Sequence, residues 1–169
     1  QRLRLLLTAC SGRGAHYWAV DGYHSFERQE AAYASGRTVA GIVLTSMKPG
    51  WSYHNYGLAI HLQRDCPPEK DEFSIVLAGD ANQVLIEEAP GVGLLRGLEF
   101  SGGNPVHVQF SPLMREVCRF ELKDAYDSGG IAAVWTLLDA QDWDTPLTQQ
   151  ERATRLEQKR ADPRFTYLR

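Results

Sequence analysis

Apolar and polar positions in the first third of the chain follow a helix, strand, helix order. The spacing predicts a helix over residues 1–9, a strand over 16–20 and a helix over 26–34. Asp21-Gly22 is expected to turn the chain between the last two of these segments. Ser25 is a suitable N-cap for the second helix, and Gly36 is a suitable end for it.

The next segment has no periodic pattern. Residues 37–56 are rich in Gly, Ser, Thr, Pro and aromatic side chains, which predicts a long irregular loop of the kind that often holds functional groups. Residues 58–62 then have the composition of a short strand. A polar stretch with Pro67-Pro68 follows it.

The second half of the chain is mainly helical in pattern. Gly102-Gly103-Asn104-Pro105 separates two short β-prone runs that could pair as a hairpin. Ser128-Gly129-Gly130 breaks a longer helical pattern in two. The predicted elements are a helix at 81–89, strands at 98–101 and 106–110, and helices at 112–126 and 131–139.

The character of the chain changes after Trp143. Thr148 and Glu151 have the spacing of a capping box, but the helix that follows has almost no apolar residue except Ala153 and Leu156. We therefore expect one domain over residues 1–143, and a charged tail over 144–169 that could dock a protein partner. The domain is expected to be α+β, with a small antiparallel sheet that bears the site and helices on the other face.

Composition excludes several other classes. The chain has 169 residues, 43% of them hydrophobic, which is enough for one core. Its net charge of −3 and its scattered Lys and Arg give no basic surface for nucleic acid. No run reaches the about 18 to 20 apolar residues that cross a bilayer. Cys10, Cys66 and Cys118 form no CxxC pair, so a thiolate zinc cluster is not indicated, although one disulfide remains possible.

Three of the five histidines, namely His54, His61 and His107, lie in or beside the predicted strands that border the long loop. Imidazole is a preferred zinc ligand, and a catalytic zinc needs three protein ligands and one open position. Taken singly, a histidine is more often an ordinary surface residue or a hydrogen-bonded core residue than a metal ligand. Their spacing alone is therefore weak evidence for a metal site.

Four sequence blocks strengthen this interpretation. They are Asp-Gly-Tyr-His-Ser-Phe-Glu-Arg-Gln at 21–29, Gly-Arg-Thr at 36–38, Ser-Tyr-His-Asn-Tyr-Gly-Leu-Ala-Ile-His at 52–61, and Pro-Val-His-Val-Gln-Phe at 105–110. In this order the blocks resemble those of the zinc D-Ala-D-Ala carboxypeptidase and L-alanyl-D-glutamate endopeptidase family. That family includes VanY-like enzymes and phage endolysins, and the hedgehog signalling domain has a similar fold. The resemblance spans about residues 15–140.

The resemblance implies a zinc site and a peptidoglycan stem peptide as the substrate. His54 and His107 match zinc ligands of the family, and His61 stands where the family has a ligand aspartate. A site of three histidines is chemically sound, although its charge is higher by one. Ser52 and His24 are expected to hold the peptide. The resemblance also gives His24 a catalytic position, because it replaces a family arginine that polarises the scissile carbonyl or holds a substrate carboxylate. A neutral imidazole lacks that residue's fixed bidentate charge.

The position of the general base is also altered. Asn104 lies three residues before His107, where the family has an acid, and an amide cannot accept the proton. Another register of the short loop would instead let Glu99 supply the base. The sequence thus leaves two functions open, a zinc peptidase of the cell wall and a pseudoenzyme that binds a metal, a stem peptide or a protein partner without cleavage. The resemblance implies a location in the cell envelope, or an exported or phage-associated protein.

Overall fold

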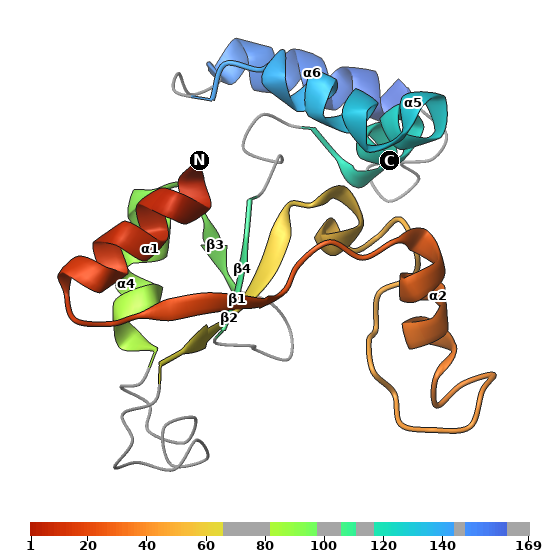
Figure 1. Cartoon of the computed structure of the whole chain (residues 1–169). Helices are drawn as coiled ribbons and strands as arrows, with labels where there is room; N and C mark the ends of the chain where they lie inside the picture. The colour runs from red at the N-terminus through yellow and green to blue at the C-terminus, as the bar shows by residue number, and fades with distance from the viewer. Residues whose placement is uncertain (66–81, 98–105, 111–116, 144–147, 162–169) are drawn as a thin grey trace. The chain divides into compact units, whose positions relative to one another are not determined.

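The computed structural model describes residues 1–65, 82–97, 106–110, 117–143 and 148–161 (Figure 1). It divides the chain into two compact units, Gln1–Ser111 and Pro112–Arg169. The predicted boundary after residue 143, and the docking role of the segment behind it, stay predictions. No helix in the described parts of the chain is both long and apolar enough to cross a membrane.

A four-stranded antiparallel sheet forms the centre of the first unit. Its strand order is β1-β2-β4-β3, and every neighbouring pair is antiparallel. The strands are β1 (Tyr17–Asp21), β2 (Ala59–Arg64), β4 (His107–Gln109) and β3 (Leu95–Arg96). This sheet confirms the predicted α+β class.

Two helices pack on one face of this sheet, α1 (Arg2–Gly12) and α4 (Gln83–Gly91) (Figure 1). Leu62 and Val108 point from the strands into the core between the sheet and these helices. Burial of such side chains is the main source of stability for a unit of this size. The buried cluster consists of Leu6, Cys10, Ala15, Leu62, Leu85, Ala89, Leu94 and Val108.

The opposite face of the sheet bears polar side chains. Successive residues of a strand point to opposite faces, so His61 lies on the face away from Leu62. The register pairs His61 with His107 and Ile60 with Val108. Both histidines of the sheet therefore lie next to each other on the face that the core leaves free.

The segment between β1 and β2 contains α2 (Phe26–Ala34) and a short 3-10 helix, η1 (Tyr53–Tyr56). Ser25 caps α2 as predicted, because its side chain accepts a hydrogen bond of 3.1 Å from the backbone N–H of Arg28. The prediction of an irregular loop over 37–56 missed η1. Ser52 caps that helix, and Gly57 ends it in the left-handed conformation at φ 68°.

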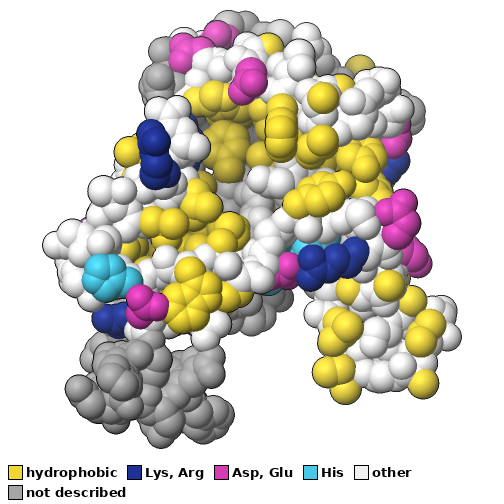
Figure 2. All heavy atoms as spheres, in the orientation of Figure 1, with side chains coloured by type: hydrophobic (Ala, Val, Ile, Leu, Met, Phe, Trp, Pro, Cys, Tyr) yellow, Lys and Arg dark blue, Asp and Glu magenta, His cyan; other side chains and the backbone are white. Residues whose placement is uncertain are grey.

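The loop between α2 and η1 exposes many apolar side chains, and Figure 2 shows them gathered over this segment. Ile42 is the most exposed of them at 75%. The group consists of Val39, Ile42, Val43, Leu44, Met47 and Trp51. These residues contribute little to the core of the unit.

The second unit contains α5 (Arg119–Asp139) and α6 (Gln149–Ala161). Gly129 and Gly130 leave helical geometry inside α5, with φ 66° at Gly130, so the predicted break is confirmed. The helix predicted over 112–126 is wrong at Val117 and Cys118, because α5 begins at Arg119 with Cys118 as its N-cap. Residues 112–116 lie outside the described parts.

The first helix continues to Gly12 instead of ending at residue 9. The strand predicted at 98–101 lies outside the described residues. Besides β2, strand β4 pairs with the two-residue strand Leu95–Arg96, which has too few residues to show an alternating pattern. Cys10 and Cys118 are free and buried, and Cys66 lies outside the described parts.

Candidate metal centre

His54, His61 and His107 come together on the free face of the sheet. Each ring offers one nitrogen, and these nitrogens all lie within 4.8 Å of one another. The ring centroids are 4.7 Å apart for His54 and His61, 5.2 Å for His54 and His107, and 5.0 Å for His61 and His107. The sequence thus predicted correctly which three histidines form a group, and the structure shows that this group could hold one metal ion.

Rigid elements position these rings. His61 and His107 are directly opposite each other on the central strands β2 and β4. His54 lies on η1, which is fixed to the turn after β1: the backbone N–H of His24 donates to the carbonyl oxygen of His54 at 3.0 Å. The Asn55 amide also donates to the carbonyl oxygen of His24 at 3.0 Å. The long loop therefore ends in a fixed segment at the site.

His54 is held in one tautomer. Its Nδ1 lies 2.6 Å from the carbonyl oxygen of Gly22, which can only accept, so Nδ1 bears the proton. Its Nε2 is buried and has no hydrogen-bond partner. An unpartnered buried lone pair is unfavourable, but it is what a metal ion requires of an imidazole ligand.

The other two rings show a similar arrangement. Nε2 of His107 lies 3.1 Å from the side-chain oxygen of Gln109, an acceptor that favours a proton on Nε2. Nδ1 of His107 then faces Nε2 of His61 at 3.0 Å. Two lone pairs at this distance repel each other unless a proton or a cation lies between them. The outer nitrogen of each ring thus faces an oxygen, and the inner nitrogens face one another.

All three imidazoles are held in the neutral form. Burial lowers the pKa of His54 to about 4, the Gly22 hydrogen bond opposes this shift, and the neighbouring histidines add to it. Burial also lowers the pKa of His61 and of His107, although the charge of Asp21 and the hydrogen bond to Gln109, respectively, act in the other direction. Neutral imidazole is the form that ligates metals, so these shifts favour metal binding near neutral pH.

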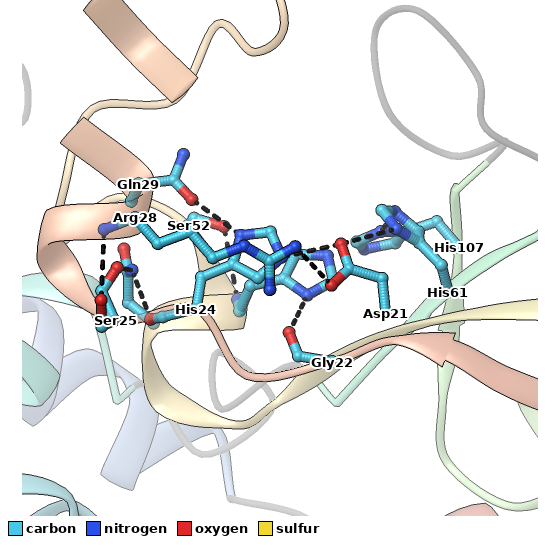
Figure 3. A network of polar contacts seen from close by, with 11 residues as sticks. Asp21, Gly22, His24, Ser25, Arg28, Gln29, Ser52, His61 and His107 are labelled. Atoms are coloured by element: carbon cyan, nitrogen blue, oxygen red, sulfur yellow. Dashed lines mark hydrogen bonds and ion pairs between the residues drawn. The ribbon is translucent and has the colours of Figure 1, made fainter. Parts of the chain in front are cut away.

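Asp21 lies beside this group at the end of β1 (Figure 3). Its carboxylate contacts Nε2 of His24 at 2.8 Å and the guanidinium of Arg28 at 2.9 Å. The distance from Asp21 Oδ2 to Nδ1 of His61 is 3.7 Å. Sequence analysis treated Asp21 as a turn residue, because an irregularity in the pairing of β1 and β2 could not be detected from the residue pattern.

His24 forms one wall of the site. Its ring stacks on that of His54, with centroids 4.5 Å and planes 15° apart. Nδ1 of His24 lies 3.3 Å from the side-chain oxygen of Gln29, and the amide nitrogen of Gln29 donates to the carbonyl oxygen of Met47 at 2.7 Å. His24 therefore lies next to the group of three histidines, and its role in holding substrate stays a prediction.

Of the other two predicted site residues, Ser52 and Asn104, the structure describes only Ser52. Ser52 is buried, and its hydroxyl accepts a hydrogen bond of 3.3 Å from the backbone N–H of His54, so it supports the fold of η1 beside the site. Asn104, the predicted catalytic position, lies outside the described residues, and so does the alternative base Glu99.

The fold and this polar site define an α+β domain with three histidines that could hold a metal ion, and comparisons with known proteins identify its family. A family model described as D-alanyl-D-alanine carboxypeptidase, VanY, matches residues 1–95. The chain therefore belongs to the VanY D-alanyl-D-alanine carboxypeptidase family. This finding confirms the resemblance that the sequence blocks indicated.

One curated relative is the peptidoglycan L-alanyl-D-glutamate endopeptidase CwlK of Bacillus subtilis (strain 168). It is 36% identical to this chain over 85 residues, which make up 49% of this chain. These residues cover 48% of the relative, so the chain spans about half of that protein's length.

Solved structures of lower identity are also similar. A mutant of the vancomycin resistance D,D-pentapeptidase VanY in complex with Zn(II) is 20% identical, with a TM-score of 0.46, over 64% of this chain and 68% of that chain. The LD-carboxypeptidase LdcB is 23% identical, with a TM-score of 0.45, over 76% of this chain and 67% of that chain.

The three histidines fit a zinc ion by the arrangement of their own nitrogens. Zinc binds imidazole nitrogen at about 2.0–2.1 Å, and a catalytic zinc ion has three protein ligands and a fourth position for water or substrate. The unpartnered Nε2 of His54 and the facing nitrogens of His61 and His107 supply such a donor set. No cysteine joins this group among the residues that the structure describes.

Proposed function

We propose that this chain is a zinc-dependent peptidase domain that acts on the stem peptides of peptidoglycan. The observation that supports this most strongly is the set of three histidines whose inner nitrogens converge while their outer nitrogens face oxygen atoms. Membership of the VanY family supports the peptidoglycan substrate, and so does the similarity to the peptidoglycan L-alanyl-D-glutamate endopeptidase CwlK.

In this proposal His54, His61 and His107 hold the zinc ion. A bound zinc ion supplies Lewis acidity toward a peptide carbonyl and lowers the pKa of water toward neutrality. The two sheet histidines cannot move far, because their strands pair with neighbours on both sides. The chain therefore provides a preorganised site, which is the main contribution of a protein to metal catalysis.

The remaining roles belong to residues around the three histidines. We assign His24 to peptide binding, because its ring forms a wall of the site against His54. Ser52 is assigned to the same role, with its hydroxyl next to His54. We assign the catalytic position of the family to Asn104. Since an amide cannot accept a proton, we expect a rate about 100 to 10,000 times below that of an enzyme with a general base.

The test combines metal analysis with product analysis. The purified protein is assayed for zinc, then incubated with synthetic stem peptides that contain L-Ala-D-Glu and D-Ala-D-Ala bonds, and the products are identified by mass spectrometry. We expect one zinc ion per chain and new termini from one of these bonds. Zinc without new termini would support the binding-only alternative, and absence of zinc would overturn the proposal.

A matched pair of variants makes this test specific. His54→Ala removes the buried ligand, and His16→Ala removes an exposed histidine of the same unit that lies outside the group. We expect His54→Ala to lose zinc and cleavage, and His16→Ala to retain both. Equal zinc content in the two variants would show that the metal binds elsewhere.

A double variant tests the altered positions. His61→Asp together with Asn104→Asp introduces the carboxylates that the family pattern has at these two places. A gain in cleavage would show that the natural chain lacks a general base at Asn104. A loss of cleavage from an active parent would show that the three-histidine site is the working one.

A further inference from the structure

An irregularity in strand β1 brings a carboxylate to the metal centre. Ala19 pairs with Leu62, but the next pair joins Asp21 to His61, so Val20 is an extra residue in β1. Without it, Asp21 would pair with Ile60 and point toward the core face. The bulge rotates Asp21 to the face that bears the histidines. Bulges often redirect a side chain in this way near active sites.

The carboxylate of Asp21 then contacts three cationic or potentially cationic groups. Oδ2 lies 2.8 Å from Nε2 of His24 and 3.7 Å from Nδ1 of His61, and Oδ1 lies 2.9 Å from the guanidinium of Arg28. Figure 3 shows Asp21 between the α2 side of the network and the two sheet histidines. Asp21 therefore connects the wall of the site to one of its proposed metal ligands.

His61 is the proposed ligand that depends on this carboxylate. The outer nitrogen of His54 faces the oxygen of Gly22, and that of His107 faces the side-chain oxygen of Gln109. Nδ1 of His61 faces the oxygen of Asp21, which is the charged member of this set of three. Histidine ligands commonly donate their second N–H to an oxygen, which fixes the tautomer and makes the ligating nitrogen more basic.

Charge gives Asp21 a second effect. Three neutral imidazoles leave both positive charges of a divalent ion uncompensated, and a nearby carboxylate lowers the energy of that ion. The side chain of Asp21 is 26% exposed, so its field is only partly screened by water. Asp21 would therefore both fix the tautomer of His61 and offset part of the charge of the metal ion.

From this geometry we propose that Asp21 is a positioning residue of the metal centre. Its carboxylate accepts the Nδ1 proton of His61, leaves Nε2 of His61 for the metal, and offsets part of the metal's charge. The inference rests on the proposed function, since it requires a zinc ion at the three histidines. It also requires the 3.7 Å gap between Asp21 and His61 to close to about 3 Å in the zinc form, the usual length of such a hydrogen bond.

The first experiment compares zinc affinities by competition with a chromophoric chelator. The variant is Asp21→Asn, which keeps the size of the side chain and removes its charge. Arg28→Gln removes another partner of the same carboxylate, and Glu87→Gln removes a carboxylate from α4 on the other face of the sheet. We expect about a 10 to 100-fold loss of affinity for Asp21→Asn alone. An affinity equal to that of the controls would overturn the inference.

The second experiment distinguishes positioning from general support of the fold. Two-bond ¹H–¹⁵N spectra of the zinc-loaded protein report which nitrogen of each histidine bears the proton. In the natural chain we expect His61 to be protonated at Nδ1, with zinc at Nε2. A proton on Nε2 of His61 would overturn the inference even if the variant failed to fold. Unchanged shifts of His61 in a folded Asp21→Asn variant would overturn it as well.

These measurements also separate this inference from the function on which it rests. If the natural chain binds no zinc, the proposed function fails and the role of Asp21 fails with it. If the natural chain binds zinc and cleaves stem peptides while Asp21→Asn binds zinc equally well, the function stands and only the role of Asp21 is refuted.

Discussion

The rings of His24 and His54 stack with centroids 4.5 Å apart, and the backbone N–H of His24 donates to the carbonyl oxygen of His54 at 3.0 Å. One residue follows β1 and the other lies on η1, so this contact joins two segments that are 30 residues apart in the chain. It also covers one side of the His54 ring, whose burial is the largest cause of its low pKa.

Removal of this stacked ring should therefore change the titration of His54. In metal-free His24→Ala, we expect the pKa of His54 to rise from about 4 toward its ordinary value of 6.5, because water reaches the ring and the charge of His24 no longer opposes protonation. A titration followed by NMR of the histidine rings measures this shift. If the pKa of His54 does not change in this variant, the burial of His54 does not depend on His24.

The stability of the metal-free protein should fall between pH 6.5 and about 4. The pKa of His54 is lowered on folding, so the unfolded chain binds a proton in this range that the folded chain does not bind. This stability is present above the unfolded pKa and is lost as the pH falls, by roughly 3 kcal/mol at most for a shift of this size. The lowered pKa values of His61 and His107 act in the same direction.

Thermal unfolding in the presence of a chelator, at several pH values, checks this prediction. The part of this range above pH 4.5 distinguishes the histidines from the carboxylates, because the pKa values of Glu27 and Glu87 are lowered from 4.5. Burial raises the pKa of the Asp21 carboxyl, but hydrogen bonds from His24 and Arg28 outweigh this effect and hold the pKa below its ordinary value of 3.8. The contribution of Asp21 to stability is therefore lost only at more acidic pH. A melting temperature that stays constant from pH 7 to 4.5 would contradict the prediction.

Local patterns were sufficient to predict most of the helices and strands that the structure describes. These features depend on neighbouring residues, which the sequence displays directly. They include the cap of α2 at Ser25, the strands around 16–20 and 58–62, and the glycine break at Gly129-Gly130. The strand β3 has two residues and forms through its pairing with β4, so no local pattern could indicate it. The same holds for η1, which depends on contacts with the turn after β1.

The site was predicted in part for a similar reason. The family resemblance indicated which three histidines come together, because the family's site residues recur in fixed sequence blocks. Asp21 reaches the site through the extra residue Val20, and a bulge is a relation between two strands that the composition of one strand does not reveal. The partners that fix the tautomers, Gly22 and Gln109, likewise act through positions that only the folded chain defines.

The core between the sheet and its two helices should control the stability of the first unit. Leu62 is fully buried in it, and we expect Leu62→Ala to reduce the free energy of unfolding by about 2–5 kcal/mol through lost burial and a cavity. Ile42→Ala removes a side chain that is 75% exposed and should change stability by less than about 0.5 kcal/mol. Equilibrium unfolding in urea measures both. Equal effects of the two substitutions would show that Leu62 is not in a closely packed core.

The cap of α2 should affect both the helix and the site. The Ser25 side chain accepts a hydrogen bond from the backbone of Arg28, and the next residue along this helix, Gln29, contacts the ring of His24. We expect Ser25→Ala to reduce the free energy of unfolding by about 1 kcal/mol, because the first turn of α2 loses an acceptor. Ser25→Asp retains an acceptor at the N-cap and should remain close to the natural chain. Ring NMR shifts of His24 should change in Ser25→Ala and much less in Ser25→Asp, since a frayed first turn lets Gln29 move. If the alanine variant loses stability while the His24 shifts stay fixed, the cap supports the helix without positioning the wall of the site.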